Sequence, residues 1–202
     1  MSGTLKVGGV PLATHTGTDG LVTGMSWGSS VPAGTVLQVV QTVKTDWWTT
    51  TASGNTPTLV TGLSRTITPA STSNKILVQA SVWASATAYS HYIWIKHNGS
   101  GSYANLSDGT NGSIGTGHIS TGFGSRTQVM FGGQGGSTES DEASTSTMSF
   151  LDSPGKDTEF TYQVYACQRY VGTMYINRTA STTDAAYTSV GISSLTLWEI
   201  KV

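Results

Sequence analysis

Apolar and polar residues alternate along most of this chain with a period of two, which is typical of half-buried β-strands. The clearest example is the run KILVQASVW, whose alternate apolar residues are Ile76, Val78, Ala80 and Val82. Similar runs are SHYIWIKH, TEFTYQVYACQ, ISSLTLWEIKV and TVLQVVQTVK, the last with Leu37, Val39 and Val43 on one side. We find no convincing amphipathic helix. The pattern predicts an all-β protein of about eight or nine strands, arranged as an antiparallel, jelly-roll-like β-sandwich.

Residues 1–34 differ in composition from residues 35–202. The first part contains an expected short strand, Thr4 to Val10, followed by PLATHTGTDGLVTGMSWGSSVPAG, in which Gly and Pro are too frequent for a self-sufficient core. We therefore expect residues 1–34 to be a short extended N-terminal arm and residues 35–202 to be the sandwich, or head domain.

Two segments are much longer than a hairpin turn requires. They are rich in Gly and Ser and lie at about residues 98–125 and 132–144. Loops of more than about 12 to 15 residues in a compact domain are usually functional or disordered. We expect them either to contact a partner or merely to face solvent.

The polarity of the chain comes from hydroxyl and amide groups rather than from charge. Charged residues make up 10% of the 202 residues, against roughly 25% in ordinary soluble domains. A net charge of -1 offers no attraction for nucleic acid or for an anionic membrane, and we expect neither as a partner. The single cysteine, Cys167, cannot form an internal disulfide, and no signal segment or membrane helix is expected.

The residues that usually perform catalysis or bind metals are poorly placed in this sequence. His91 and His97 are about 20 Å apart along an extended strand, too far to share one ion within a chain. His118 could meet its copies on a threefold axis and bind a metal there, or be an ordinary loop histidine. Asp141 and Glu142 should both be solvated and ionised, whereas glycosidases need one acid whose pKa is raised by burial. We expect no enzyme activity, no metal and no cofactor.

Aromatic residues give the more informative signal. Trp47 and Trp48 are adjacent, so in an extended strand their side chains point to opposite faces and one of them can leave the core. Exposed aromatic rings on a hydroxyl-rich surface of low charge suit a saccharide-binding platform. In the long loop, Tyr103, His118 and Phe123 are the candidates for such a surface.

Four stretches of the sequence carry a family resemblance. These are VPAGTVLQVVQTVKTD, VTGLSRTITPASTSNKILV, SFLDSPGKDTEFTYQVYA and MYINRT. Together they resemble a β-domain found in structural proteins of tailed phages from aquatic hosts, of the tail-fibre or capsid-decoration type. The likeness covers about residues 31–202, and the opening SGTLKVGGV is similar to the starts of phage fibre-like proteins.

The resemblance implies a homotrimeric virion protein that assembles in the host cytoplasm and is released by lysis. The arm would dock onto other virion proteins through its apolar residues, which are Leu5, Val7, Val10, Leu12, Leu21 and Val22. Because there is little room for a shaft between arm and head, we expect a short tail fibre whose head binds a host-surface saccharide. The alternative is a capsid cement protein that bridges capsid subunits.

Overall fold

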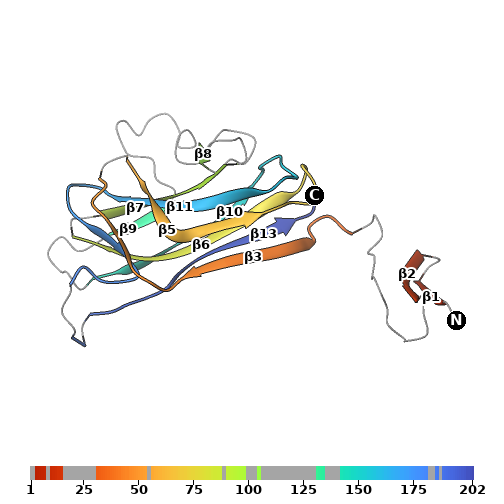
Figure 1. The fold of residues 1–202 in the computed structure, drawn as a ribbon, viewed down its shortest axis with the longest axis horizontal. Coiled ribbons are helices and arrows are strands. Elements are labelled where there is room, and N and C mark those ends of the chain that lie inside the picture. Colours follow the sequence, from red (N-terminus) through yellow and green to blue (C-terminus); the bar gives the residue numbers. More distant parts are fainter. Residues whose placement is uncertain are drawn as a thin grey trace.

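The structure is a computed structural model of the chain. It describes residues 3–7, 10–15, 31–53, 56–87, 90–98, 104–105, 131–134, 142–181, 185–186 and 188–202. Every regular element among these residues is a β-strand, and the head consists of two antiparallel sheets (Figure 1). The prediction of an all-β sandwich is therefore confirmed.

Each sheet is built around long strands with shorter ones at its margins. The first sheet contains β3 (Val36–Lys44), β13 (Ser193–Ile200), β6 (Lys75–Ala86), β10 (Ser144–Asp152), β12 (Met174–Ile176) and β4 (Trp48–Thr50). The second sheet contains β5 (Thr58–Ile67), β11 (Phe160–Gln168), β7 (Ser90–His97), β8 (Ala104–Asn105) and β9 (Phe131–Gln134).

The strand order is that of a jelly roll. The first sheet runs β3-β13-β6-β10, and the second runs β5-β11-β7-β9. If the short β4, β8 and β12 are set aside, the eight remaining strands pair in the order first-eighth-third-sixth and second-seventh-fourth-fifth. This order corresponds to two interlocking Greek keys.

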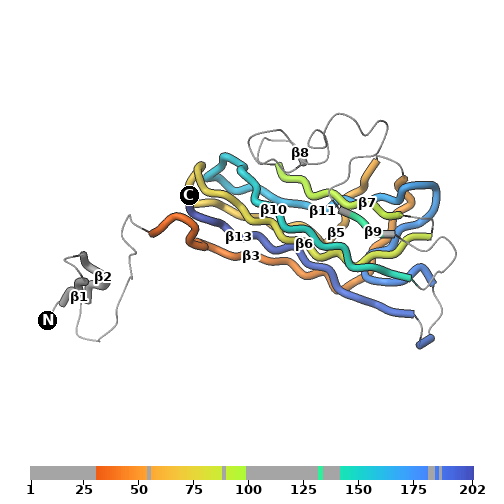
Figure 2. The backbone as a smooth tube through the Cα atoms, turned by 180° about the vertical axis from the view of Figure 1, so that it is seen from behind, coloured from red at the N-terminus to blue at the C-terminus, as the bar shows by residue number. Residues whose placement is uncertain are grey.

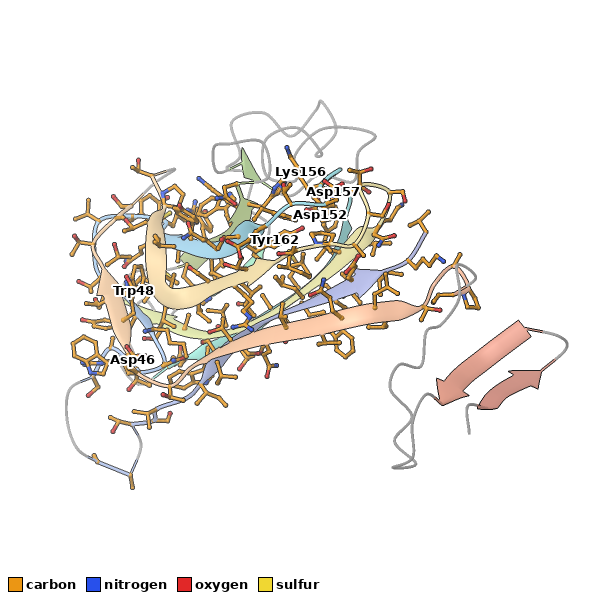
Figure 3. The ribbon with its side chains drawn as sticks, turned by 45° about the vertical axis from the view of Figure 1, so that its right-hand side comes forward. Asp46, Trp48, Asp152, Lys156, Asp157 and Tyr162 are labelled. Carbon is orange, nitrogen blue, oxygen red and sulfur yellow. The ribbon has the colours of Figure 1, made fainter. Side chains whose placement is uncertain are left out.

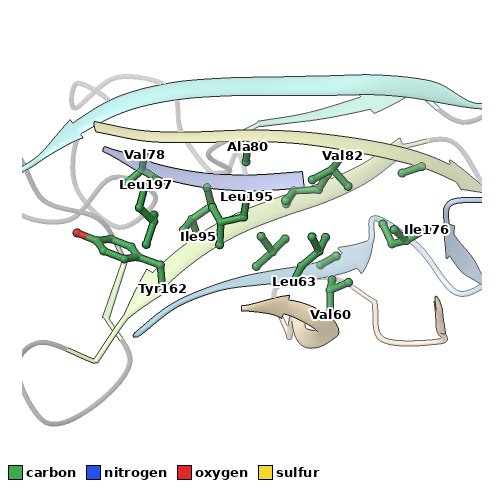
Figure 4. Packing of buried hydrophobic residues seen from close by; sticks show 14 of the residues in the cluster. Val60, Leu63, Val78, Ala80, Val82, Ile95, Tyr162, Ile176, Leu195 and Leu197 are labelled. Carbon is green, nitrogen blue, oxygen red and sulfur yellow. The ribbon is translucent and has the colours of Figure 1, made fainter. Parts of the chain in front are cut away.

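The core lies between the two inner sheet faces, as the alternation in the sequence predicts. In β6, the side chains of Ile76, Val78, Ala80 and Val82 are at most 2% exposed. They pack with apolar side chains of β7, β11 and β13, among them Ile95, Tyr162, Leu195 and Leu197 (Figure 4). Each large apolar side chain buried in this way contributes about 1.5–3 kcal/mol.

The sandwich has two distinct ends. At one, here called the arm end, the chain enters at residues 31–35, and the amides of Gly34 and Lys201 donate to the carbonyls of Lys201 and Thr35 (Figure 2). The connections at residues 68–74 and 153–159 also lie there. The opposite end, here called the far end, consists of residues 45–53, 169–173, 177–181 and 188–192.

The N-terminal residues form a hairpin rather than one strand. β1 (Gly3–Val7) and β2 (Val10–His15) pair in an antiparallel sheet of their own. The prediction of a single strand from Thr4 to Val10 is therefore wrong. The sequence between the two strands is Gly-Gly, a pair common in two-residue hairpin turns. Leu5, Val7, Val10 and Leu12 lie on these strands, whereas Leu21 and Val22 lie outside the described residues.

A buried carboxylate holds the connection between β5 and β6 at the arm end. Glu199 of β13 is 1% exposed and accepts hydrogen bonds from the side chains of Gln38 at 2.6 Å and Asn74 at 2.5 Å. It also accepts one from the backbone amide of Ala70 at 2.7 Å. The TPASTSN stretch therefore folds around an acceptor that lies close to the C-terminus of the chain.

We predict that Glu199→Ala lowers the free energy of unfolding by about 2–4 kcal/mol, because the buried side chain of Asn74 and two partly buried donors lose their acceptor. Urea unfolding of purified protein measures the change. Glu159→Ala is the matched control, because it removes the same charge from an exposed side chain. Equal stability of the two variants would contradict this role for Glu199.

Candidate functional site at the far end of the sandwich

The two long loops join the sandwich at different places. Tyr103, His118 and Phe123 all lie outside the described residues, so the structure does not bring them together. The first long loop, which contains them, leaves β7 beside Asn98 at the arm end. It rejoins the second sheet at Phe131 of β9, which pairs with Ile93 in the middle of β7. The second loop, by contrast, joins strands whose adjoining residues lie at the far end, because Gln134 pairs with Ser90 and Ser144 pairs with Ala84. The two loops therefore start from opposite ends of the head.

The two adjacent tryptophans separate as the sequence predicts. Trp48, in β4, packs against the core (Figure 3). Trp47, in the turn before β4, is 58% exposed at the far end. An indole ring this exposed offers an apolar face for a ligand.

The guanidinium group of Arg178 lies against two aromatic rings. Its central carbon is 5.3 Å from the ring centre of Trp47 and 4.9 Å from that of Tyr175, both within cation–π range. Its Nε donates to the carbonyl of Thr179 at 3.0 Å, and an Nη donates to that of Ser181 at 3.4 Å. We call Trp47, Tyr175 and Arg178 the arginine–aromatic cluster.

No acidic side chain neutralises Arg178 among the described residues. The acid nearest in sequence to Trp47 is Asp46, whose carboxylate is 2.8 Å from the ammonium group of Lys44. The hydrogen bond from Lys44 lowers the pKa of Asp46, so this carboxylate is ionised and already paired. Arg178 is half-buried, and its charge is held by aromatic rings and carbonyl dipoles instead.

Asn177 fixes the cluster to the scaffold. It adopts a left-handed backbone conformation with φ of 64°, which asparagine tolerates better than most residues. Its side-chain amide donates to the carbonyls of Lys44 at 2.8 Å and Asp46 at 3.0 Å, and its oxygen accepts from Ser193 at 2.6 Å. The turn that carries Trp47 is thereby tied to the segment that carries Arg178. The MYINRT stretch contains this asparagine, but its hydrogen-bond partners are distant in the sequence and no local pattern indicates them.

Other exposed side chains add to the apolar character of the far end. Tyr170 is 48% exposed and lies under the guanidinium of Arg169, at 4.7 Å. Val171, Val190 and Ile192 are 90%, 84% and 62% exposed. Exposed apolar groups gathered at one end of a domain are typical of a contact surface.

The outer face of the first sheet is a second candidate surface, and its central rows carry no charged side chain. One row crosses β3, β13, β6 and β10 and consists of Val39, Trp198, Leu77 and Leu151. The next row consists of Gln41, Thr196, Gln79 and Ser149, and the one after it of Val43, Ser194, Ser81 and Thr147. The hydroxyl and amide groups of β6, β10 and β13 line a shallow groove of about 450 Å³.

This outer face exposes apolar side chains, as surfaces that pack against another molecule often do. The sequence predicts that Leu37, Val39 and Val43 share one side of a strand, and the structure confirms it. That side is the outer one, where they are 37–47% exposed.

Two acidic groups of the head, Asp152 and Glu199, are buried for structural reasons. Asp152 is 0% exposed and accepts a 2.6 Å hydrogen bond from the hydroxyl of Tyr162, whose pKa is raised by burial and by this carboxylate (Figure 3). Asp152 and Glu199 flank Ile76 in register on either side of β6, about 10 Å apart between backbones. Both therefore point into the sandwich and serve its packing.

His91 and His97 share the inner face of β7, and burial lowers the pKa of each. That of His91 falls to about 4, and its Nε2 lies 3.3 Å from the hydroxyl of Ser146. For His97, the carboxylate of Asp152, 3.8 Å away, partly opposes the effect of burial. The described residues contain no group of three or more potential metal ligands, and no helix long and apolar enough to cross a bilayer.

Comparisons with known proteins identify no family. No protein-family profile and no curated protein sequence matches the chain. A solved structure of the infectious bursal disease virus Gx strain is similar with a TM-score of 0.36 and 8% identity. The match covers 96% of this chain and 47% of that one, so this chain spans about half its length.

We predict that acid destabilises the head through His91. Because the folded-state pKa lies below the unfolded value of 6.5, the unfolded chain binds a proton between pH 6.5 and 4 that the folded chain does not. Stability is therefore fully present above pH 6.5 and falls as pH decreases, by about 2 kcal/mol at pH 5.

Urea unfolding at pH 7 and pH 5 tests this prediction. His91→Gln should reduce the pH-dependent loss by about 2 kcal/mol, because glutamine does not titrate. The control His15→Gln lies in the separate hairpin and should leave the loss unchanged. An identical loss in wild type and His91→Gln would show that His91 does not titrate with a depressed pKa.

Proposed function

We propose that this protein is a non-enzymatic structural component of a phage particle, a short trimeric tail fibre. In this proposal residues 1–34 dock onto other virion proteins and the head contacts a saccharide on the host surface. The observation that carries the proposal is the separation of the two ends. The chain enters the sandwich at the arm end, while Trp47 and its neighbours are exposed at the far end. A head anchored by its arm would present the far end outward.

Self-association is proposed through the outer face of the first sheet. Rows without charge can be buried against a copy of themselves without like-charge repulsion or the cost of desolvating ions. The exposed apolar side chains of Val39 and Leu151 supply area for such an interface. The family resemblance implies three copies. Several heads on one fibre would bind a surface that carries many saccharides more tightly than one head binds one saccharide.

A capsid cement protein is the second candidate, favoured by the edge strand β3. Val36, Leu37, Val39 and Val43 of this strand are all partly exposed. An edge strand with apolar side chains can pack against, or pair with, a neighbouring protein. In that role β3 and its sheet would bridge capsid subunits, and the far end would face solvent.

Either role places the protein in the virion after assembly in the host cytoplasm. Neither requires catalysis, a cofactor, nucleic acid or a membrane. The buried positions of Asp152, Glu199, His91 and His97 agree with this proposal, because a substrate would have to enter the core to reach them.

The attachment role predicts that deletion of residues 1–30 leaves a folded head that is missing from particles. Circular dichroism reports the fold, and immunoblotting of purified virions reports incorporation. Trp47→Ala is the control, because it alters the far end and should be incorporated normally. A truncated protein still present on virions would refute the role of the arm. Electron cryo-microscopy then separates the two candidates, since a fibre occupies the tail and a cement protein covers the shell.

The self-association role predicts that Val39→Glu converts the wild-type trimer, with three times the mass of 21.1 kDa, into a monomer. A buried, unpaired carboxylate in an apolar row costs several kcal/mol per subunit. Light scattering after size-exclusion chromatography measures the mass. Thr61→Glu is the control, because Thr61 is exposed on β5 of the second sheet. Monomeric wild-type protein would refute the trimer, and trimeric Val39→Glu would refute this surface.

A further inference from the structure

We propose that the arginine–aromatic cluster of Trp47, Tyr175 and Arg178 binds an acidic saccharide, meaning a sugar that carries a carboxylate. The inference rests on the proposed function in that such a sugar would belong to the host surface. It goes further by placing the site on specific residues and by giving the ligand a charge.

The charge of Arg178 is the first part of the argument. A guanidinium group has five N–H donors, and here one from Nε and one from an Nη are used by the carbonyls of Thr179 and Ser181. The other donors and the positive charge have no acidic partner among the residues that the structure describes. A planar guanidinium recognises a carboxylate with two parallel hydrogen bonds, so a carboxylate is the group that completes this site.

The ring of Trp47 is the second part. At 58% exposure it presents a broad apolar surface next to the guanidinium, 5.3 Å from its central carbon. Sugar rings have an apolar C–H face that packs on aromatic rings, while their substituents hydrogen-bond around it. A ligand that places such a face on Trp47 and its carboxylate on Arg178 uses both groups at once.

The surroundings favour an anion despite the carboxylate of Asp46. Lys44 lies 2.8 Å from Asp46 and offsets its charge, so repulsion of an incoming carboxylate is reduced. Asn177 holds the backbone of both Lys44 and Asp46, and its neighbour is Arg178. The cluster is therefore positioned before a ligand arrives, which lowers the entropic cost of binding.

Titration of the full-length protein with trigalacturonate, a trimer of a carboxylate-bearing sugar, tests this inference. The indole N–H signals in ¹H–¹⁵N spectra follow binding, and Trp47→Ala identifies the signal of Trp47. We expect a dissociation constant of about 1 mM, as is common for a single small site. Maltotriose, a neutral sugar trimer, and triglutamate, an acidic peptide, should each bind at least tenfold more weakly.

Variants locate the site. Trp47→Ala and Arg178→Gln should each weaken trigalacturonate binding at least tenfold. Arg178→Lys should weaken it several-fold, because lysine keeps the charge but lacks the two parallel N–H donors of the guanidinium group. Tyr170→Ala is the matched control, since it removes an exposed far-end ring beside another arginine, and should bind as wild type does. Thermal unfolding shows that each variant is folded. If Arg178→Gln does not fold, Trp47→Ala and Arg178→Lys decide the test.

Four outcomes would overturn the inference. If maltotriose bound as tightly as trigalacturonate, the site would not require an acidic group. If triglutamate bound as tightly, the site would not require a saccharide. If Tyr170→Ala weakened trigalacturonate binding as much as Trp47→Ala does, the site would not be at the arginine–aromatic cluster. Absence of any binding by wild type would overturn it outright. None of these results depends on whether the arm incorporates the protein into virions. The proposed function is therefore tested separately, by the deletion of residues 1–30.

Discussion

Packing of the two inner sheet faces is the interaction on which the rest of this structure depends. With one cysteine in the chain, the head has no internal disulfide, and its described residues contain few ion pairs. Its stability comes from apolar side chains such as Val78, Ile95 and Leu197 that interlock between the sheets. Strand order follows from this constraint, because each strand must bury one face, and the jelly-roll connections let neighbouring strands in the chain alternate between sheets.

The polar groups inside this core organise its two ends. At the arm end Glu199 gathers donors from the connection between β5 and β6, while at the far end Asn177 ties the turn before β4 to the segment after β12. Satisfied buried polar groups of this kind specify one arrangement of loops, because any other leaves them unpaired. The far end is therefore a firmly held surface, which suits recognition, although its side chains are drawn from segments distant in sequence.

Particular residues show how far the sequence pattern reaches. It predicted the long strands of the head, the buried face of β6 and the separation of Trp47 from Trp48. It also grouped Leu37, Val39 and Val43 on one side of β3, yet a period of two does not say which side is inward, and in the structure this side lies on the outer face of the first sheet. The single strand expected from Thr4 to Val10 became a hairpin because alternation alone does not detect a reversal of the chain.

The candidate site marks the division between local and tertiary information. The sequence by itself determined the all-β class, the low charge and the opposite orientation of the two adjacent tryptophans, because these depend on composition and on the alternation of neighbouring residues. Only the tertiary structure decided that Arg178 lies on Trp47 and Tyr175 and that Asn177 holds them together. Pairing of β12 with β4 creates that contact, and such pairing depends on how all strands share one core, which no local pattern encodes.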